Sequence, residues 1–210
     1  MVFLMTPAMA LAQAGMIRRK NAASMLMQIL TGVVIGSTMY FLFGFSLSFA
    51  PTVGGMKSGG IIGTLEYALL RNLSPTDCNP NFAGADTIPG PLYFAYQLMF
   101  AIHTPLIVTG AWVEKMNFNA FLIFVVLWPL LVYYPLAHAV WNTQGFLSVF
   151  GVLDYAGGLP IHTGAGVAGL VVSLAMVRRK PNDHGTPHHS LPLAYLGCAL
   201  VFAGWYSFIA

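Results

Sequence analysis

Asp154 and His162 lie in a long apolar stretch that otherwise has the composition of a membrane helix. Ionisable groups are costly in hydrocarbon, so in membrane proteins they tend to line a pathway. If the stretch is helical, their separation of eight positions corresponds to a rise of about 12 Å. With Asp154 at the surface of a hydrocarbon core about 30 Å thick, His162 would lie near its midplane. A titratable imidazole at that depth predicts the passage of something small and polar, with or without its proton.

Each of these residues also has a purely structural interpretation. Asp154 could cap the helix that follows it by accepting free backbone N–H groups. His162 could hydrogen-bond to a neighbouring helix, because small residues on its own helical face are typical of close helix packing in membranes. Pro160 should kink the helix unless the first turn begins there. The small residues that share the face of His162 are Gly158, Ala165, Gly166 and Gly169.

The composition places the whole chain in a membrane. Of the 210 residues, 57% are hydrophobic and only 7% are charged, with a mean hydropathy of +0.73. Soluble domains carry about a quarter charged residues, which excludes an ordinary soluble enzyme. Strict alternation of apolar and polar residues is absent, which argues against an outer-membrane barrel. The predicted fold class is an all-α integral membrane protein.

Hydropathy divides the chain into six apolar segments, each expected to form a helix in the bilayer. The first is short for a full crossing and the last ends without a polar anchor, so both ends of the chain are expected to be truncated. A long external loop is expected at 51–90. The segments are 2–17, 22–50, 91–113, 118–141, 155–177 and 190–210.

Basic residues determine the predicted orientation. They concentrate in loops 18–21, 114–117 and 178–189, whereas only Lys57 and Arg71 lie in the other loops. Cytoplasmic loops carry an excess of Lys and Arg, so these three loops are predicted to be cytoplasmic and the N-terminal end external. The net charge of +3 then reflects membrane topology, and no nucleic-acid partner is predicted.

No cofactor or metal site is predicted. Histidines cluster between His184 and His189, but Gly and Pro make this segment a flexible connector without further ligand types at suitable spacing beyond Asp183. Cys78 and Cys198 have no metal-binding spacing either.

Several aromatic and polar residues in the apolar segments could bind a cation or simply pack. An indole face attracts an ammonium-like cation by about 0.5–2 kcal/mol, and Trp141 ends the fourth segment, where an interfacial belt tryptophan is equally typical. His103 and His138 are interpreted as hydrogen-bonding groups between helices. The residues that could equally be core are Tyr96, Gln97, Phe100 and Phe208.

Taken together, these residues resemble the signature of the Amt/Mep/Rh ammonium transporters. The run from Leu153 to Gly158, followed by His162 and by 168–170, carries the resemblance most clearly. Trp141 makes it closer to the Amt/Mep branch. Further matches occur in order along essentially all of the chain, at 19–21, 40–49, 96–101, Glu114, 136–141 and 204–205.

The resemblance implies a fold of eleven helices in two inverted five-helix repeats, assembled as a homotrimer in the lipid bilayer. This chain would supply the first repeat and most of the sixth helix. Trp141 and Asp154 would recruit the substrate at an external aromatic site. Tyr96 and Phe208 would form the pore gate. His162, with Gln97, would line the pore and handle the proton.

The chain departs from the family pattern in ways that leave the site incomplete. The second pore histidine belongs to the repeat that this chain lacks, and Tyr96 adds a hydroxyl where a phenylalanine is expected. Pro160 and Ile209 also differ from the expected residues.

The predicted function is transport of ammonium or ammonia, with methylammonium as an analogue. Neutral ammonia would cross the apolar lumen because carrying a charge there is costly. Alternatives are an ammonium sensor on the same scaffold, or a fragment that is inactive without the second repeat. A membrane enzyme that uses the histidine cluster is a more distant alternative, and the chain is predicted not to be an enzyme.

Overall fold

The computed structural model describes residues 2–55, 59–76, 87–176 and 187–209. Within these ranges the regular secondary structure is helical, and extended segments meet only at two isolated bridges, Thr52 with Gly63 and Gly60 with Gly145. Five helices of the described chain are long and apolar enough to cross a membrane. The protein is therefore an all-helical membrane protein, as its composition predicts.

The helices follow the apolar segments of the sequence. Two of them begin at side-chain caps: Asn117 accepts the N–H of Ala120 at 2.7 Å, and Ser190 accepts that of Leu193 at 3.3 Å. The bounds are α1 (Val2–Met16), α2 (Arg19–Met39), α3 (Phe45–Phe49), α4 (Gly90–Ile107), α5 (Phe118–Trp128), α6 (Tyr134–Trp141), α7 (Phe146–Val149), α8 (Gly164–Ala175) and α9 (Leu191–Phe208).

Three short π-helical segments, called π-turns below, adjoin the α-helices of the described chain. They lie at Tyr40–Gly44 between α2 and α3, at Pro129–Tyr133 between α5 and α6, and at Gly158–Thr163 before α8. Pro129 explains the second turn, because a proline removes the backbone donor that an α-helix needs. Such turns are frequent at functional sites, and the third one contains His162.

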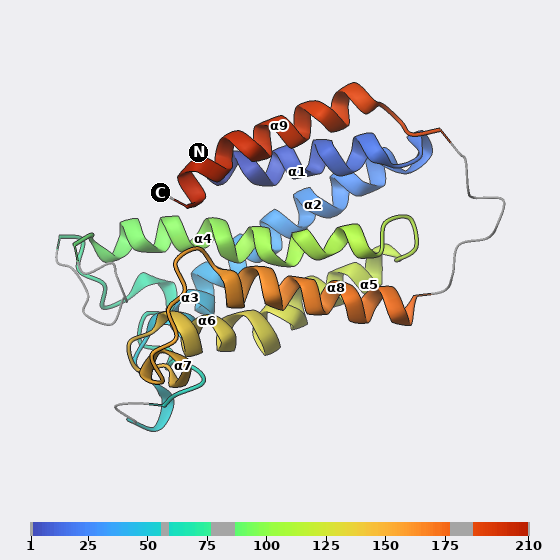
Figure 1. Cartoon of the computed structure of the whole chain (residues 1–210). Helices are drawn as coiled ribbons and strands as arrows, with labels where there is room; N and C mark the ends of the chain where they lie inside the picture. Colours follow the sequence, from blue (N-terminus) through green and yellow to red (C-terminus); the bar gives the residue numbers. More distant parts are fainter. Residues whose placement is uncertain (1, 56–58, 77–86, 177–186, 210) are drawn as a thin grey trace.

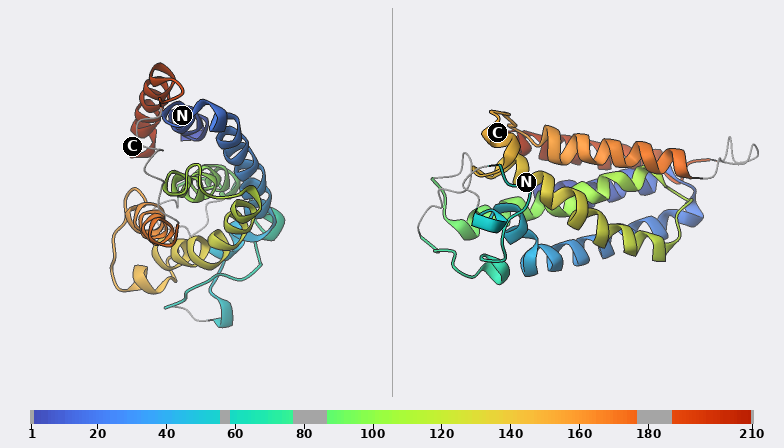
Figure 2. Two further views of the ribbon diagram at one scale, coloured as in Figure 1. Left: turned by 90° about the vertical axis from the view of Figure 1, so that its right-hand side faces the viewer. Right: turned by 90° about the horizontal axis from the view of Figure 1, so that it is seen from below.

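The helices form a bundle around α4. Helix α4 packs against α1, α2, α5 and α8, and an end-on view shows it near the centre of the group (Figure 2). Helices α1 and α9 run antiparallel, side by side, along one edge of the bundle (Figure 1). Segments from both ends of the sequence therefore lie next to each other.

Glycines allow the close approach of α1 and α9. A Cβ atom added at Gly197 would overlap the backbone of Ala12, and one added at Gly15 would overlap the backbone of Ala194. Small residues at a helix crossing let two backbones approach closely in a membrane, where van der Waals packing drives association. The pair thus fixes the position of α9 relative to the first helix.

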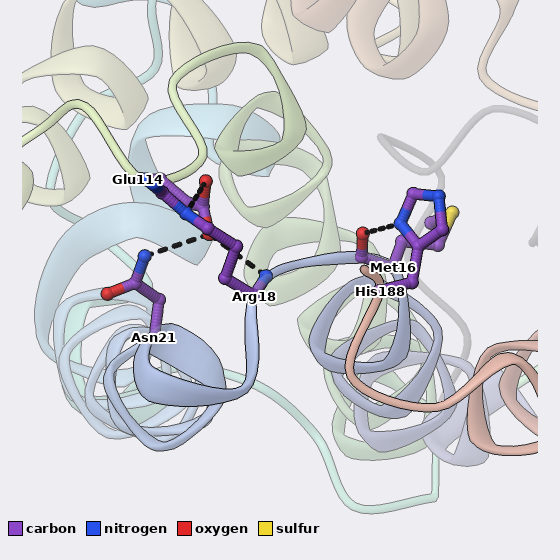
Figure 3. Close-up of polar contacts among 5 residues, drawn as sticks. All are labelled: Met16, Arg18, Asn21, Glu114 and His188. Atoms are coloured by element: carbon purple, nitrogen blue, oxygen red, sulfur yellow. Dashed lines mark hydrogen bonds and ion pairs between the residues drawn. The ribbon is translucent and has the colours of Figure 1, made fainter. Parts of the chain in front are cut away.

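A polar cluster joins three loops at one end of the bundle (Figure 3). The Arg18 Nε donates to both carboxylate oxygens of Glu114 at 3.0 and 3.1 Å, and Asn21 donates to the same carboxylate at 2.8 Å. Nearby, the Nδ1 of His188 lies 2.6 Å from the carbonyl oxygen of Met16. The loops that follow α1, α4 and α8 therefore share one end of the molecule. Arg178, Arg179 and Lys180, which contributed to the predicted orientation, lie outside the described residues.

The environment of Glu114 stabilises its charge. Burial alone would raise the pKa of this carboxyl, but the hydrogen bonds from Arg18 and Asn21 and the guanidinium charge outweigh it, so the pKa of Glu114 is lowered. Its backbone has a φ of 65°, a left-handed conformation that side chains rarely adopt. We infer that these contacts hold the loop in this conformation.

Candidate functional site

A cavity of about 420 Å³ opens where α4, α6 and α9 meet the loop before α8. Five of the six residues predicted for the site line this cavity, and the sixth, His162, lies in an adjoining crevice that shares Asp154 and Phe208 with it. The lining contains one acid and no lysine or arginine among the described residues. The five are Tyr96, Gln97, Trp141, Asp154 and Phe208.

Asp154 caps the π-turn that carries His162. Its Oδ1 accepts the backbone N–H groups of Ala156 at 3.2 Å and Gly158 at 2.9 Å, and its Oδ2 accepts that of Leu159 at 3.0 Å. The free N–H groups at the start of a helix favour a negatively charged acceptor. Asp154 therefore does cap this turn, as one of its two interpretations predicted. The capped loop forms one wall of the cavity.

The predicted helical separation of Asp154 and His162 is wrong, because residues 154–157 are not helical. Gly157 has a φ of 74°, a left-handed conformation suited to glycine, and a Cβ there would overlap the side chain of Ile161. Helical structure begins at Gly158, so Pro160 lies in the first turn, where no donor is missed. Eight residues of sequence thus span a loop and one turn.

A row of aromatic rings leads from the cavity to His162. The rings of Tyr96 and Phe100 meet edge to face at 4.7 Å, and those of Phe100 and Phe208 do so at 5.0 Å and 89°. Phe208 in turn lies 5.7 Å from the His162 ring and stacks on Trp205 at 4.9 Å. The values in ångströms are distances between ring centroids, and the angle is the one between the ring planes.

The ring contact of Phe208 on α4 is made by Phe100, and Tyr96 lies one helical turn further out. The pairing of Tyr96 with Phe208 that the resemblance implied is therefore not the one found among the described rings. Tyr96 and Phe100 are four residues apart, so both lie on one face of α4. This spacing is the feature of the sequence that indicates a second aromatic ring beside Tyr96.

His162 is exposed in this chain, on the crevice between its π-turn and the end of α9. Only some of the small residues on its helical face pack against other parts of this chain. Ala165 is buried and Gly169 faces the side chain of Ala111, whereas a Cβ atom added at Gly166 would meet nothing within 4 Å. Within this chain, close packing therefore accounts for only part of this small-residue face.

Gln97 carries an unsatisfied acceptor at the cavity wall. Its Nε2 donates to the hydroxyl of Tyr93 at 3.1 Å, while its Oε1 is buried and has no partner in the described chain. A buried carbonyl without a donor is unfavourable by about 1–3 kcal/mol.

Trp141 is half-buried at the end of α6 and lines the same cavity as Asp154. The following residue, Asn142, is fully buried and donates to the carbonyl of Ala50 at 3.1 Å. This contact fixes the end of α6 and with it the indole.

The residues that the structure describes contain no group of three or more metal-ligating side chains. His188 bonds to the backbone of Met16, and Cys198 is a free, exposed thiol on α9. His184 and Cys78 lie outside the described residues.

Comparisons with known proteins agree on one family. The family model described as the Ammonium Transporter Family matches residues 1–210. The chain is 44% identical to a protein named Ammonium transporter 1 from Dictyostelium discoideum, over 100% of this chain and 44% of that protein. It is 41% identical to an ammonium transporter from Bacillus subtilis, over 99% of this chain and 48% of that protein.

Solved structures agree with this result. The crystal structure of Saccharomyces cerevisiae Mep2 matches with a TM-score of 0.79 and 32% identity, covering 99% of this chain and 45% of that one. A structure named Sensor Amt Protein matches with a TM-score of 0.82 and 25% identity, covering 99% and 50%. The chain spans about half the length of the curated relatives it matches. It belongs to the ammonium transporter family.

Proposed function

We propose that the complete protein carries ammonium nitrogen across a membrane, and that this chain supplies the outer recruitment site and one side of the pore. One observation carries the proposal. A polar cavity, a pair of edge-to-face phenylalanines and an intramembrane imidazole follow one another without a gap in the contacts of this chain. Membership of the ammonium transporter family supports ammonium as the cargo.

The cavity suits an ammonium ion. The Trp141 indole offers a face for cation–π attraction, and Asp154 adds negative potential while it holds the loop in place. The lining also includes Asp154, Tyr93 and Tyr96, whose side chains carry hydrogen-bond acceptors. Potassium has a similar size and charge but no directed N–H donors, so acceptors of this kind favour ammonium.

Phe100 and Phe208 form the constriction in this proposal, and Tyr96 belongs to the outer cavity. Two phenyl rings present no polar partner to a cation, so crossing as an ion is costly. Ammonium therefore gives one proton to His162, whose ring contacts Phe208, and neutral ammonia continues into the apolar lumen.

The remaining walls of the pore lie outside this chain in our proposal. Both α8 and α9, which flank His162, carry exposed apolar side chains, and the rest of the complete protein would cover them, including the second histidine that the family resemblance implies. A homotrimer in the lipid bilayer, with the loops after α1, α4 and α8 cytoplasmic, completes the proposed arrangement. The exposed apolar side chains of α8 and α9 include Val167, Leu170, Val171, Leu174, Tyr195, Phe202 and Tyr206.

A sensor is the second candidate, because one similar structure is named Sensor Amt Protein. A sensor needs the recruitment cavity but no flux beyond the constriction. The two functions therefore differ in transport and share binding.

The test is uptake of labelled methylammonium into vesicles that contain the complete protein. We expect saturable uptake above that of protein-free vesicles. Because cation–π attraction is worth about 0.5–2 kcal/mol, Trp141→Leu should raise the half-saturation concentration by roughly 2- to 30-fold. Saturable binding without uptake would support the sensor, and the absence of both would overturn the proposal.

A further inference from the structure

His103 is a second imidazole inside the bundle. It lies on α4 and is 6% exposed. Its Nδ1 is 3.2 Å from the hydroxyl oxygen of Thr6 on α1. Its Nε2 has no hydrogen bond within the described residues, yet it is not among their fully buried, unpaired polar atoms. One nitrogen is thus held and the other is left available.

The position of His103 relates it to the constriction. It follows Phe100 by three residues, a rise of about 4.5 Å along the same side of α4. Phe100 contacts Phe208, which contacts His162, and His103 lies one turn of α4 beyond Phe100 on the same face.

His138 shows what a structural histidine looks like in this protein. It is fully buried, its Nδ1 lies 3.0 Å from the carbonyl oxygen of Ser48, and its Nε2 lies 3.0 Å from the hydroxyl of Thr52. A carbonyl only accepts, so Nδ1 must carry the proton and the ring has one tautomer. Both nitrogens are used, and no proton can be exchanged without breaking a bond.

His103 differs from His138 in both respects. Its partner is a hydroxyl, which can either donate or accept, so either tautomer of the His103 ring keeps the bond to Thr6. Its second nitrogen is available. A group that binds a proton at one nitrogen needs this freedom, whereas a group that only ties two helices together does not.

We propose that His103 is a proton acceptor behind the constriction, so that this half of the pore contains two working imidazoles. The inference rests on the proposed transport function. Ammonium gives one proton to the lone pair on Nε2 of neutral His103, directly or through His162, and leaves neutral ammonia and an imidazolium. Water on the far side of the constriction removes that proton and regenerates the neutral ring.

The test compares His103→Asn with Thr6→Val in the complete protein, reconstituted into proteoliposomes. The amide of asparagine occupies the position of Nδ1, so it keeps a partner for Thr6 while the proton acceptor is lost. Thr6→Val removes the contact and keeps the imidazole. The measurements are charge displacement evoked by ammonium, methylammonium uptake and melting temperature, and His103→Gln replaces the asparagine variant if that variant does not fold.

We expect His103→Asn to lower the charge displacement on the order of tenfold or more, because a positioned proton acceptor typically contributes at least that much. Its melting temperature should stay close to that of the wild type, and Thr6→Val should retain most of the charge displacement. Charge displacement within twofold of wild type in the His103 variant would overturn the inference while transport stands. Uptake by the wild type without any charge displacement would do the same. A wild type without uptake would overturn both proposals.

Discussion

The three hydrogen bonds of Asp154 make its substitution the most informative perturbation of the outer site. Asp154→Asn keeps an oxygen for the N–H groups of Ala156 and Gly158 but turns an amide donor toward the N–H of Leu159. Asp154→Ala loses all three bonds. The series therefore separates the cap from the charge.

The size of the effect follows from these bonds. A hydrogen bond to a charged acceptor contributes about 1.5–3 kcal/mol, so losing one should reduce the population of the ordered loop by roughly 10- to 100-fold. The alanine variant loses more, although the three contributions are not additive. We expect methylammonium uptake to fall in the order wild type, asparagine, alanine.

The assay is initial uptake by the complete protein in vesicles, normalised to the amount of folded protein. Asn117→Ala is the matched control, because it removes an exposed cap from α5 and should cost about 1 kcal/mol of stability with uptake unchanged. If the charge of Asp154 alone mattered, asparagine and alanine would lower uptake equally. That result would refute the capping argument.

Two further predictions concern stability, measured by thermal unfolding. Glu114→Gln should destabilise the protein by about 1–3 kcal/mol at neutral pH, because Arg18 loses its ionic partner. The pKa of Glu114 is lowered in the folded state, so this contribution is present above the unfolded pKa of about 4.3 and is lost as the pH falls through the folded pKa. The two melting temperatures should therefore converge below about pH 4, and a constant difference would contradict the assignment. Gly197→Val should destabilise the α1–α9 crossing by about 1–3 kcal/mol or more, because its side chain would overlap Ala12. Cys198→Val, at the exposed neighbouring position, is the control, and equal effects would argue against the close crossing.

The fold class could be predicted because hydropathy depends on composition over long windows. The π-helical segments that interrupt the long helices could not be predicted in this way. A π-turn depends on which backbone donor is missing and which ring approaches, as at Pro129 and at Gly44, where the Tyr134 ring leaves no room for a Cβ atom. These are tertiary conditions that a helical pattern of apolar residues does not contain.

The candidate site could be predicted as a set of residues but not as an arrangement. Residue types and the family resemblance assigned Trp141, Asp154 and Phe208 to one site, and these three residues do line one cavity. The partner of Phe208 differs because the rotation of α4 presents Phe100 to it, and sequence spacing alone leaves both aromatics of that face possible. His103 was interpreted as a helix–helix hydrogen-bonding group, and its bond to Thr6 fits that, but its second nitrogen could only be assessed from the structure.

The central claim is that nitrogen passes the phenylalanine pair and meets His162. The most direct measurement is ammonium flux into proteoliposomes that contain the purified complete protein, with His162→Ala reconstituted at the same density. We expect flux well above that of empty vesicles for the wild type and a collapse toward the empty-vesicle rate for the variant. Undiminished flux through the folded variant would contradict the pore assignment, and no flux through the wild type would contradict transport itself.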